Sequence, residues 1–217
     1  MPDKRELLIN VAREMCRDAL VLGTWGNVSV RAGEGEMWIT PTGLPYESMA
    51  TEDLVRQDFA GAVLAGKRKP SSEWRLHAAL YQARPDCGAV VHTHSVYATA
   101  FAVARQPVLP VVEDLAQVAG GAVEVAEYAL PGTAELAGNA VVALADKSAV
   151  LLASHGLVGV AGDLPSALQV CRVVEKAAQV LLLARQLGPV QPLTIGDIKS
   201  MRRFYLESYG QDRPGAG

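Results

Sequence analysis

Apolar residues recur along the chain at two different spacings, and these spacings separate the expected helices from the expected strands. A repeat of three to four residues predicts helices over 4–22, 71–83, 132–145 and 163–187, the first with Gly23 as its C-cap. Short apolar runs predict strands over 28–30, 37–40, 89–92 and 149–154. Because helices and strands alternate through short connections, the pattern favours a layered α/β domain.

The length and composition favour a single folded domain. The chain has 217 residues, of which 50% are hydrophobic and 20% are charged, and it contains no internal repeat. We expect one domain over residues 1–210 and a flexible polar tail over residues 211–217. The mean hydropathy of +0.16 is high for a monomer and suggests an oligomer that buries apolar surface between its subunits.

Charge and sequence patterns disfavour several classes of partner. With 20 Lys+Arg against 23 Asp+Glu the net charge is −3, so no basic field favours nucleic acid. The chain has no run of roughly 18–20 apolar residues that could span a membrane, and its charged N-terminus does not resemble a secretory signal. Cys16, Cys87 and Cys171 form no CxxC pair, which is typical of free thiols in a reducing cytoplasm. We therefore expect a cytoplasmic protein.

The placement of the histidines is the most informative chemical feature of the sequence. His92 and His94 end a predicted strand, where residues two apart point to the same face, so their imidazoles are expected to lie side by side. His155 follows a second apolar strand and precedes Gly156. Three imidazoles with one open position are a common site for a catalytic divalent ion. The alternative is three unrelated histidines, each hydrogen-bonded to a backbone carbonyl.

A metal site of this kind needs a carboxylate, and the predicted helix over 71–83 offers a candidate. Glu73 and His77 are four residues apart, so they share one face of that helix. The periodicity does not decide which of the two turns toward the metal. If Glu73 approaches the ion, it could act as a fourth ligand, as an acid/base, or as both in turn.

Three separate turns could bind an anion. They are GTWGN (23–27), PTG (41–43) and SSE (71–73), and each offers backbone N–H groups beside hydroxyl or amide side chains. The third turn also begins a predicted helix, whose N-terminus attracts phosphate. The chain has no Walker A or GxGxxG motif, so a nucleotide is disfavoured. Beside a metal site, the turns predict a small phosphorylated substrate; turn formation alone is the alternative.

A set of ordered motifs carries a resemblance to a known family. The motifs are GTWGNVSVR, ITPTGLPYE, PSSEWRLH, AVVHTHSVYATA, YALPGT and LLASHGL. Together they closely resemble the class II aldolase/adducin-head family, from the first predicted helix to about Tyr209. The resemblance implies a single-domain, three-layer α/β/α fold with a central mixed, largely antiparallel sheet.

The resemblance also implies roles for individual residues. Matching the family's zinc site are Glu73, His92, His94 and His155, which implies one divalent metal per subunit; Zn²⁺ is expected, and Mn²⁺, Co²⁺ or Fe²⁺ could bind the same ligands. The residues that match its phosphate pocket are Gly26, Asn27, Thr42, Gly43, Ser71 and Ser72, with Thr24 beside them. Tyr209 matches a catalytic tyrosine lent by a neighbouring subunit, in a homotetramer with active sites at subunit interfaces.

The activity implied by the resemblance is that of a metal-dependent lyase. It would cleave a ketose 1-phosphate, such as fuculose 1-phosphate or a related deoxy-sugar phosphate, reversibly to dihydroxyacetone phosphate and a short aldehyde. Glu73 would protonate the enediolate that becomes dihydroxyacetone phosphate.

Two features of the sequence keep alternatives to this activity open. Glu113 and Asp114 stand in the region where family aldolases have a catalytic tyrosine, and Pro131 stands in place of a phenylalanine. A carboxylate in this region also occurs in the methylthioribulose-1-phosphate dehydratase branch. A sugar-phosphate dehydratase, decarboxylase or epimerase is therefore the alternative. A metal-free, adducin-like scaffold is a third hypothesis, but such a scaffold would not need the four ligand residues.

Overall fold

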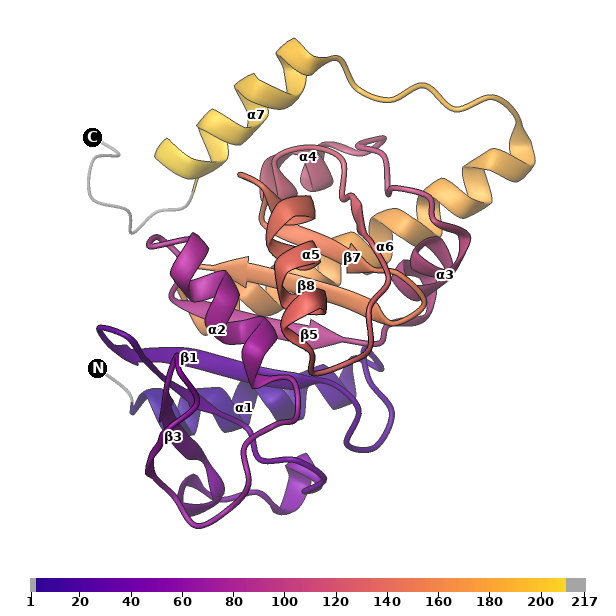
Figure 1. Ribbon diagram of the computed structural model, residues 1–217. Helices are drawn as coiled ribbons and strands as arrows, with labels where there is room; N and C mark the ends of the chain where they lie inside the picture. Colours follow the sequence, from indigo (N-terminus) through magenta and orange to yellow (C-terminus); the bar gives the residue numbers. More distant parts are fainter. Residues whose placement is uncertain (1–2, 210–217) are drawn as a thin grey trace.

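The computed structural model describes residues 3–209, and its centre is one eight-stranded sheet (Figure 1). The strands are β1 (Asn27–Gly33), β2 (Glu36–Ile39), β3 (Val55–Asp58), β4 (Val63–Ala65), β5 (Ala89–Thr93), β6 (Val125–Ala126), β7 (Ala149–Leu152) and β8 (Gly156–Ala161). They lie in the order β4-β3-β2-β1-β5-β8-β7-β6. Only β6 and β7 run parallel among the described strands, so the sheet is mixed but largely antiparallel.

Helices cover both faces of this sheet. They are α1 (Lys4–Arg17), α2 (Trp74–Ala83), α3 (Val96–Ala104), α4 (Glu113–Ala119), α5 (Ala134–Leu144), α6 (Leu164–Leu187) and α7 (Ile195–Glu207), with two short 3₁₀ turns at Tyr46–Ser48 and Thr51–Asp53. Residues of α1, α3, α4 and α6 share one apolar core with the sheet, and residues of α2 and α5 share a second. The predicted three-layer α/β/α fold in a single domain is therefore confirmed.

The two cores arise from the alternation of side chains along the strands. On β5, Ala89 and Val91 point into the core with α1, α3 and α6, whereas Val90 points into the core with α2 and α5. All residues of β5 are buried, because the strand lies near the middle of the sheet between β1 and β8. A functional side chain at the end of β5 is therefore held by a strand that is fixed on both faces.

The first helix is shorter than its apolar pattern predicts. The helix α1 ends at Arg17 rather than at residue 22, and the prediction of Gly23 as its C-cap is wrong. Ala19 adopts a positive φ of 55°, and the backbone N–H of Leu20 bonds back to the carbonyl of Met15, which closes the helix. Leu20 and Val21 are nevertheless buried, so the apolar pattern continues into a loop that leads to β1.

The helix α7 lies apart from the two layers, across the end of the molecule opposite α1 (Figure 1). It packs against α4, and Arg202 fixes it by donating to the carbonyls of Gln117 and Val118 and to the hydroxyl of Ser148. The helix α7 has no buried residue of its own. The predicted tail over 211–217 lies outside the described residues.

No described helix is long and apolar enough to cross a membrane. The three cysteines all lie within the described residues and are unpaired, with Cys87 and Cys171 buried. Burial raises the pKa of Cys87 to about 11 and that of Cys171 to about 12, so both are held as inert thiols.

Candidate metal centre and anion pocket

One carboxylate and three imidazoles meet at the end of β5. The Nε2 atom of His92 lies 3.0 Å from Nε2 of His94 and 3.2 Å from Nε2 of His155. The Glu73 carboxylate completes the group, with Oε2 at 3.2 Å from Nε2 of His92 and Oε1 at 3.4 Å from Nε2 of His155. The ligand atoms of these four residues all lie within 4.8 Å of one another.

Each member of this cluster comes from a different structural position. His92 is in β5, opposite Asn27 of β1 and Val158 of β8, and His94 follows directly after the strand, so both imidazoles lie on the same side. His155 lies in the tight turn between β7 and β8. Glu73 is the N-cap residue of α2, and its side chain points toward the three histidines.

The cluster fits a divalent metal ion. Ligand atoms bound at about 2.0–2.1 Å around a tetrahedral ion lie roughly 3.3 Å apart, and the four contacts above span 3.0–3.4 Å. The Oε1 atom of Glu73 is buried and has no hydrogen-bond partner, which is costly for a carboxylate unless a cation takes that place. His92 directs Nδ1 at the carbonyl of Leu157, 3.0 Å away; donation there leaves Nε2 with its lone pair toward the cluster.

The protonation states of Glu73, His94 and His155 also suit metal ligation. Burial lowers the pKa of His94 to about 3 and that of His155 to about 4, so both imidazoles are neutral near pH 7. Burial alone would raise the pKa of Glu73, but His92, His155 and the side-chain amide of Asn27 hold it well below its usual range. Glu73 is therefore an anion in the folded chain.

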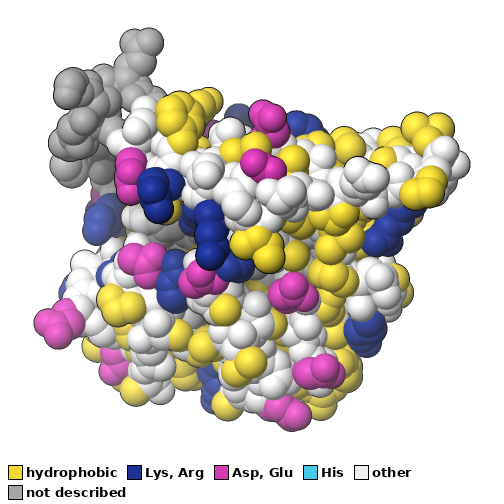
Figure 2. All heavy atoms as spheres, turned by 90° about the horizontal axis from the view of Figure 1, so that it is seen from above, with side chains coloured by type: hydrophobic (Ala, Val, Ile, Leu, Met, Phe, Trp, Pro, Cys, Tyr) yellow, Lys and Arg dark blue, Asp and Glu magenta, His cyan; other side chains and the backbone are white. Residues whose placement is uncertain are grey.

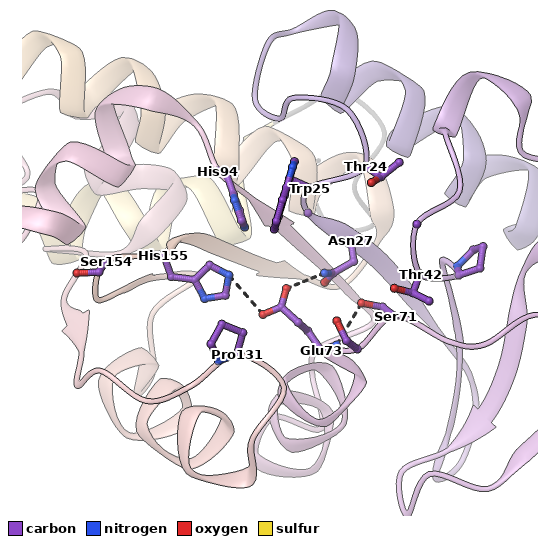
Figure 3. A pocket seen from close by; sticks show the side chains of 14 residues that line it. Thr24, Trp25, Asn27, Thr42, Ser71, Glu73, His94, Pro131, Ser154 and His155 are labelled. Carbon is purple, nitrogen blue, oxygen red and sulfur yellow. Dashed lines mark hydrogen bonds and ion pairs between the residues drawn. The ribbon is translucent and has the colours of Figure 1, made fainter.

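The four-residue cluster opens into a cavity of about 520 Å³ (Figure 3). The residues of the three predicted anion-binding turns line the same cavity: Thr24, Gly26, Asn27, Thr42, Gly43, Ser71 and Ser72. Figure 3 shows Glu73 between His155 on one side and Asn27 and Ser71 on the other. The structure thus brings the expected metal ligands and the expected phosphate pocket together in a single site.

Backbone geometry explains why the first turn carries a glycine next to the cluster. Gly26 has a φ of +97°, and a Cβ at this position would lie 2.7 Å from the carbonyl oxygen of His92. Any larger residue would force the turn away from β5. The second and third turns are joined by a bridge between Pro41 and Pro70, which holds Thr42 and Ser71 on the same wall.

The structure settles which of Glu73 and His77 turns toward the cluster. Glu73 faces the histidines, whereas His77 lies behind it, completely buried. The side chain of Asn27 connects the two: its Nδ2 donates to Oε2 of Glu73 at 2.9 Å, and its Oδ1 lies 2.5 Å from Nε2 of His77. Burial lowers the pKa of His77 to about 3, so this imidazole is neutral.

Three residues with implied catalytic roles lie outside the cavity of their own chain. Glu113 and Asp114 form the first turn of α4, where Asp114 pairs with Lys176 of α6. Tyr209 follows α7, is 54% exposed, and contacts the rings of Phe204 and Tyr205. None of the three lines the pocket that holds the metal cluster.

Two further residues, Trp25 and Pro131, shape the pocket. The side chain of Trp25, which sequence reasoning did not assign to the site, is 68% exposed, and its ring lies 6.1 Å from that of His94. Pro131 lines the wall on the side of His155 (Figure 3). The next residue, Gly132, has a φ of +77°, and a Cβ there would lie 2.7 Å from the carbonyl oxygen of Ser72, so this loop closes tightly on the start of α2.

Comparison with known proteins gives the class to which this fold and site belong. The model of the Class II Aldolase and Adducin N-terminal domain matches residues 6–182, and the chain belongs to this family.

Individual relatives carry aldolase names. The chain is 43% identical over 175 residues to the L-fuculose phosphate aldolase of Escherichia coli O6:H1, covering 81% of this chain and 80% of that protein. It is 36% identical over 208 residues to the 5-methylthioribulose-1-phosphate/5-deoxyribulose-1-phosphate aldolase of Rhodospirillum rubrum, covering 96% and 93%. A solved structure of an L-fuculose 1-phosphate aldolase superposes with a TM-score of 0.91 at 38% identity, covering 95% and 97%. These similarities support an enzyme of the aldolase family.

Proposed function

We propose that this protein is a divalent-metal-dependent aldolase that cleaves a ketose 1-phosphate reversibly to dihydroxyacetone phosphate and a short aldehyde. The observation that carries the proposal is the shared cavity, in which Glu73 and three imidazoles meet three turns suited to a phosphate. The names of the relatives, which include fuculose and 5-deoxyribulose phosphates, support a deoxy-sugar phosphate as the substrate. The phosphate would bind Thr42, Ser71 and Ser72 at one end of the cavity.

The metal ligands of this proposal are Glu73, His92, His94 and His155. Zn²⁺ is the ion we expect, and Mn²⁺, Co²⁺ or Fe²⁺ are compatible with the same donors. A divalent ion held there supplies Lewis-acid polarisation of the substrate carbonyl.

In the proposed reaction, Glu73 moves the proton. In the direction of condensation, its carboxylate takes a proton from the hydroxymethyl carbon of dihydroxyacetone phosphate. The electron pair left on that carbon forms the new bond to the aldehyde carbon, and the aldehyde oxygen takes a proton from an acid. Cleavage reverses each step, so Glu73 returns its proton to the three-carbon product. The low pKa of Glu73 keeps the metal-free site in the anionic form that accepts a proton.

The candidate acids for the aldehyde end, Tyr209, Glu113 and Asp114, do not line the cavity of their own chain. We propose Tyr209 for this role, together with Glu113 or Asp114, from a neighbouring copy in a homotetramer whose active sites lie between subunits. Many large apolar side chains on the ends of α6 and α7 are exposed: Val180, Leu182, Leu183, Leu187, Ile195, Phe204 and Leu206. Figure 2, which shows the face that carries α7, displays apolar patches there that a neighbouring copy would cover.

The decisive experiment supplies the metal-loaded protein with candidate ketose 1-phosphates and couples product formation to a dihydroxyacetone phosphate reporter. We expect one triose phosphate to be released for each sugar consumed. A sugar consumed without release of triose phosphate would contradict the aldolase and favour a dehydratase, decarboxylase or epimerase of the same superfamily. The three unpaired cysteines agree with the cytoplasmic location that we propose for the enzyme.

A further inference from the structure

A row of buried polar side chains extends from Glu73 into the core beneath α2. Asn27 and Ser29 come from β1, and His77 and Tyr81 come from α2; all four are at most 4% exposed. Asn27 contacts Nε2 of His77. On the other side of the ring, Nδ1 of His77 lies 2.6 Å from the hydroxyl of Ser29. The hydroxyl of Ser29 in turn lies 2.9 Å from the hydroxyl of Tyr81. These residues occupy the core shared by α2 and the sheet, where apolar side chains would pack as well.

The direction of every hydrogen bond in this row follows from its first member. The carboxylate of Glu73 can only accept, so Asn27 must turn its NH₂ group toward Oε2 and its carbonyl oxygen toward His77. That oxygen requires a donor, which places the proton of the neutral imidazole of His77 on Nε2. The Nδ1 atom of His77 then accepts from Ser29, and Ser29 accepts in turn from Tyr81.

Because of these hydrogen bonds, one carboxylate oxygen of Glu73 has a hydrogen-bond donor and the other has none. Oε2 is held by Asn27 at 2.9 Å, whereas Oε1 faces His155 at 3.4 Å without a hydrogen-bond partner. If the donor on His77 were absent, the buried carbonyl oxygen of Asn27 would lose its partner, and only Glu73 would hold the amide. The amide and the carboxylate that it binds could then rotate together out of their present orientation.

We propose that His77 is a positioning residue for the acid/base Glu73, acting through Asn27. The proton on Nε2 of His77 fixes the amide of Asn27, and the amide presents the Glu73 carboxylate in the one orientation that leaves Oε1 free. Ser29 and Tyr81 fix the tautomer of His77. The role in turnover rests on the proposed function; the orientation of Glu73 can be measured without it.

Two substitutions at His77 separate this role from simple packing. In His77→Gln the side-chain amide can still donate from a position close to Nε2, whereas His77→Phe fills the space without a donor. Loss of an outer hydrogen-bond partner of a metal site typically costs about 10–100-fold in metal affinity or activity. We expect His77→Phe to lower kcat and weaken Zn²⁺ binding by a factor in that range with little change in KM. His77→Gln should retain most of both.

The matched control is Leu80→Ala, because Leu80 is fully buried on the same helix and its apolar side chain makes no hydrogen bond in the row. It should lower the melting temperature without lowering kcat for the folded enzyme. Zn²⁺ affinity, measured by competition with a chelating dye, gives a readout that needs no substrate. If His77→Phe binds Zn²⁺ and turns over like the wild type, or if His77→Gln fails as badly as His77→Phe, the positioning role is wrong.

A spectroscopic measurement tests the direction of the row even if the phenylalanine variant does not fold. Long-range ¹H–¹⁵N spectra of the metal-free wild type, labelled on its histidines, report which ring nitrogen of His77 carries the proton, and His77→Gln identifies its signals. The proposal expects the proton on Nε2. A proton on Nδ1 would overturn it. A wild type that shows the expected tautomer and Zn²⁺ affinities but releases no triose phosphate would contradict the proposed function alone.

Discussion

The two groups of residues implied in catalysis differ in how the fold treats them. Glu73, His92 and His155 lie against one another at the buried end of β5, within a cavity that this single chain builds. Asp114 and Tyr209 lie on α4 and after α7, on the surface and outside that cavity. In our proposal the first group needs only its own chain to hold an ion, whereas the second would contribute only if another copy brings it to the site.

The difference shows which parts of the proposed chemistry depend on assembly. In the proposal, metal binding and the proton transfer by Glu73 need only one subunit, in which β5, the strand of His92, is paired on both sides with β1 and β8. In our proposal, protonation of the aldehyde oxygen would need Tyr209, which follows α7; that helix contacts its own chain through Arg202 and through Tyr205, which packs against the core. Substitutions in the first group should therefore abolish activity within their own subunit, whereas substitutions in the second group should affect the site of a neighbouring subunit.

The largest effect is expected inside the cavity, from Glu73→Gln. The amide keeps the size of the side chain and an oxygen toward the cluster but cannot accept a proton. We expect the three histidines to retain the ion and kcat to fall by about 10²–10⁴-fold, the usual contribution of a positioned acid/base. Metal content and kcat are measured on the same sample. Turnover at the wild-type rate would remove Glu73 from the acid/base role.

A smaller effect is expected from Tyr209→Phe, and mixing two variants tests where this tyrosine acts. Alone, Tyr209→Phe should lower kcat by about 10²-fold, and His92→Ala should be inactive because it lacks a metal ligand. When the two are unfolded and reassembled together, about a quarter of the sites should combine an intact metal cluster with an intact tyrosine from the neighbouring subunit. Activity in the mixture should rise well above that of either variant. If it does not rise, the two groups do not meet between subunits.

The smallest effect is on the folding stability of the protein at low pH, through the buried His77. Burial lowers the pKa of His77 to about 3 from the ordinary value of 6.5, so between these values the unfolded chain binds more protons than the folded one. Protonation of His77 in the unfolded chain therefore lowers the free energy of unfolding as the pH falls below about 6.5. Between pH 7 and pH 5 this loss is about 2 kcal/mol.

Urea unfolding of the metal-free protein at both pH values measures this loss. His77→Gln cannot titrate in this range, so its stability should fall by about 2 kcal/mol less than that of the wild type. Equal losses in the two proteins would show that His77 does not stay neutral in the folded state.

The sequence predicted the interior group better than the surface group because local geometry fixes it. A period of two places His92 and His94 on one side of β5 whatever the rest of the fold does. The choice between Glu73 and His77 was open, because helical periodicity gives a shared face but not the position of the N-cap. Glu73 reaches the cluster because α2 begins one residue later, at Trp74. His77 then lies one turn further along, behind Asn27.

Other features depended on tertiary contacts that no local pattern records. The apolar repeat continues through Leu20 and Val21, but these residues pack in the core from a loop, so α1 ends earlier than the repeat suggests. Trp25 lies beside Gly26 in a turn and is exposed at the cavity, a position that its residue type alone does not predict. The helix α7 has no fully buried residue, so no apolar stripe marks its place; Arg202 and the partly buried Tyr205 hold it against the rest of the chain.

The central claim is that the interior group holds a divalent ion, and elemental analysis tests it most directly. The wild type and His92→Ala would be purified identically, incubated with Zn²⁺, freed of unbound ion, and analysed for metal per chain. We predict about one equivalent in the wild type and a small fraction of that in the variant. Less than about a tenth of an equivalent of any divalent metal in the wild type would contradict the account and favour a metal-free scaffold.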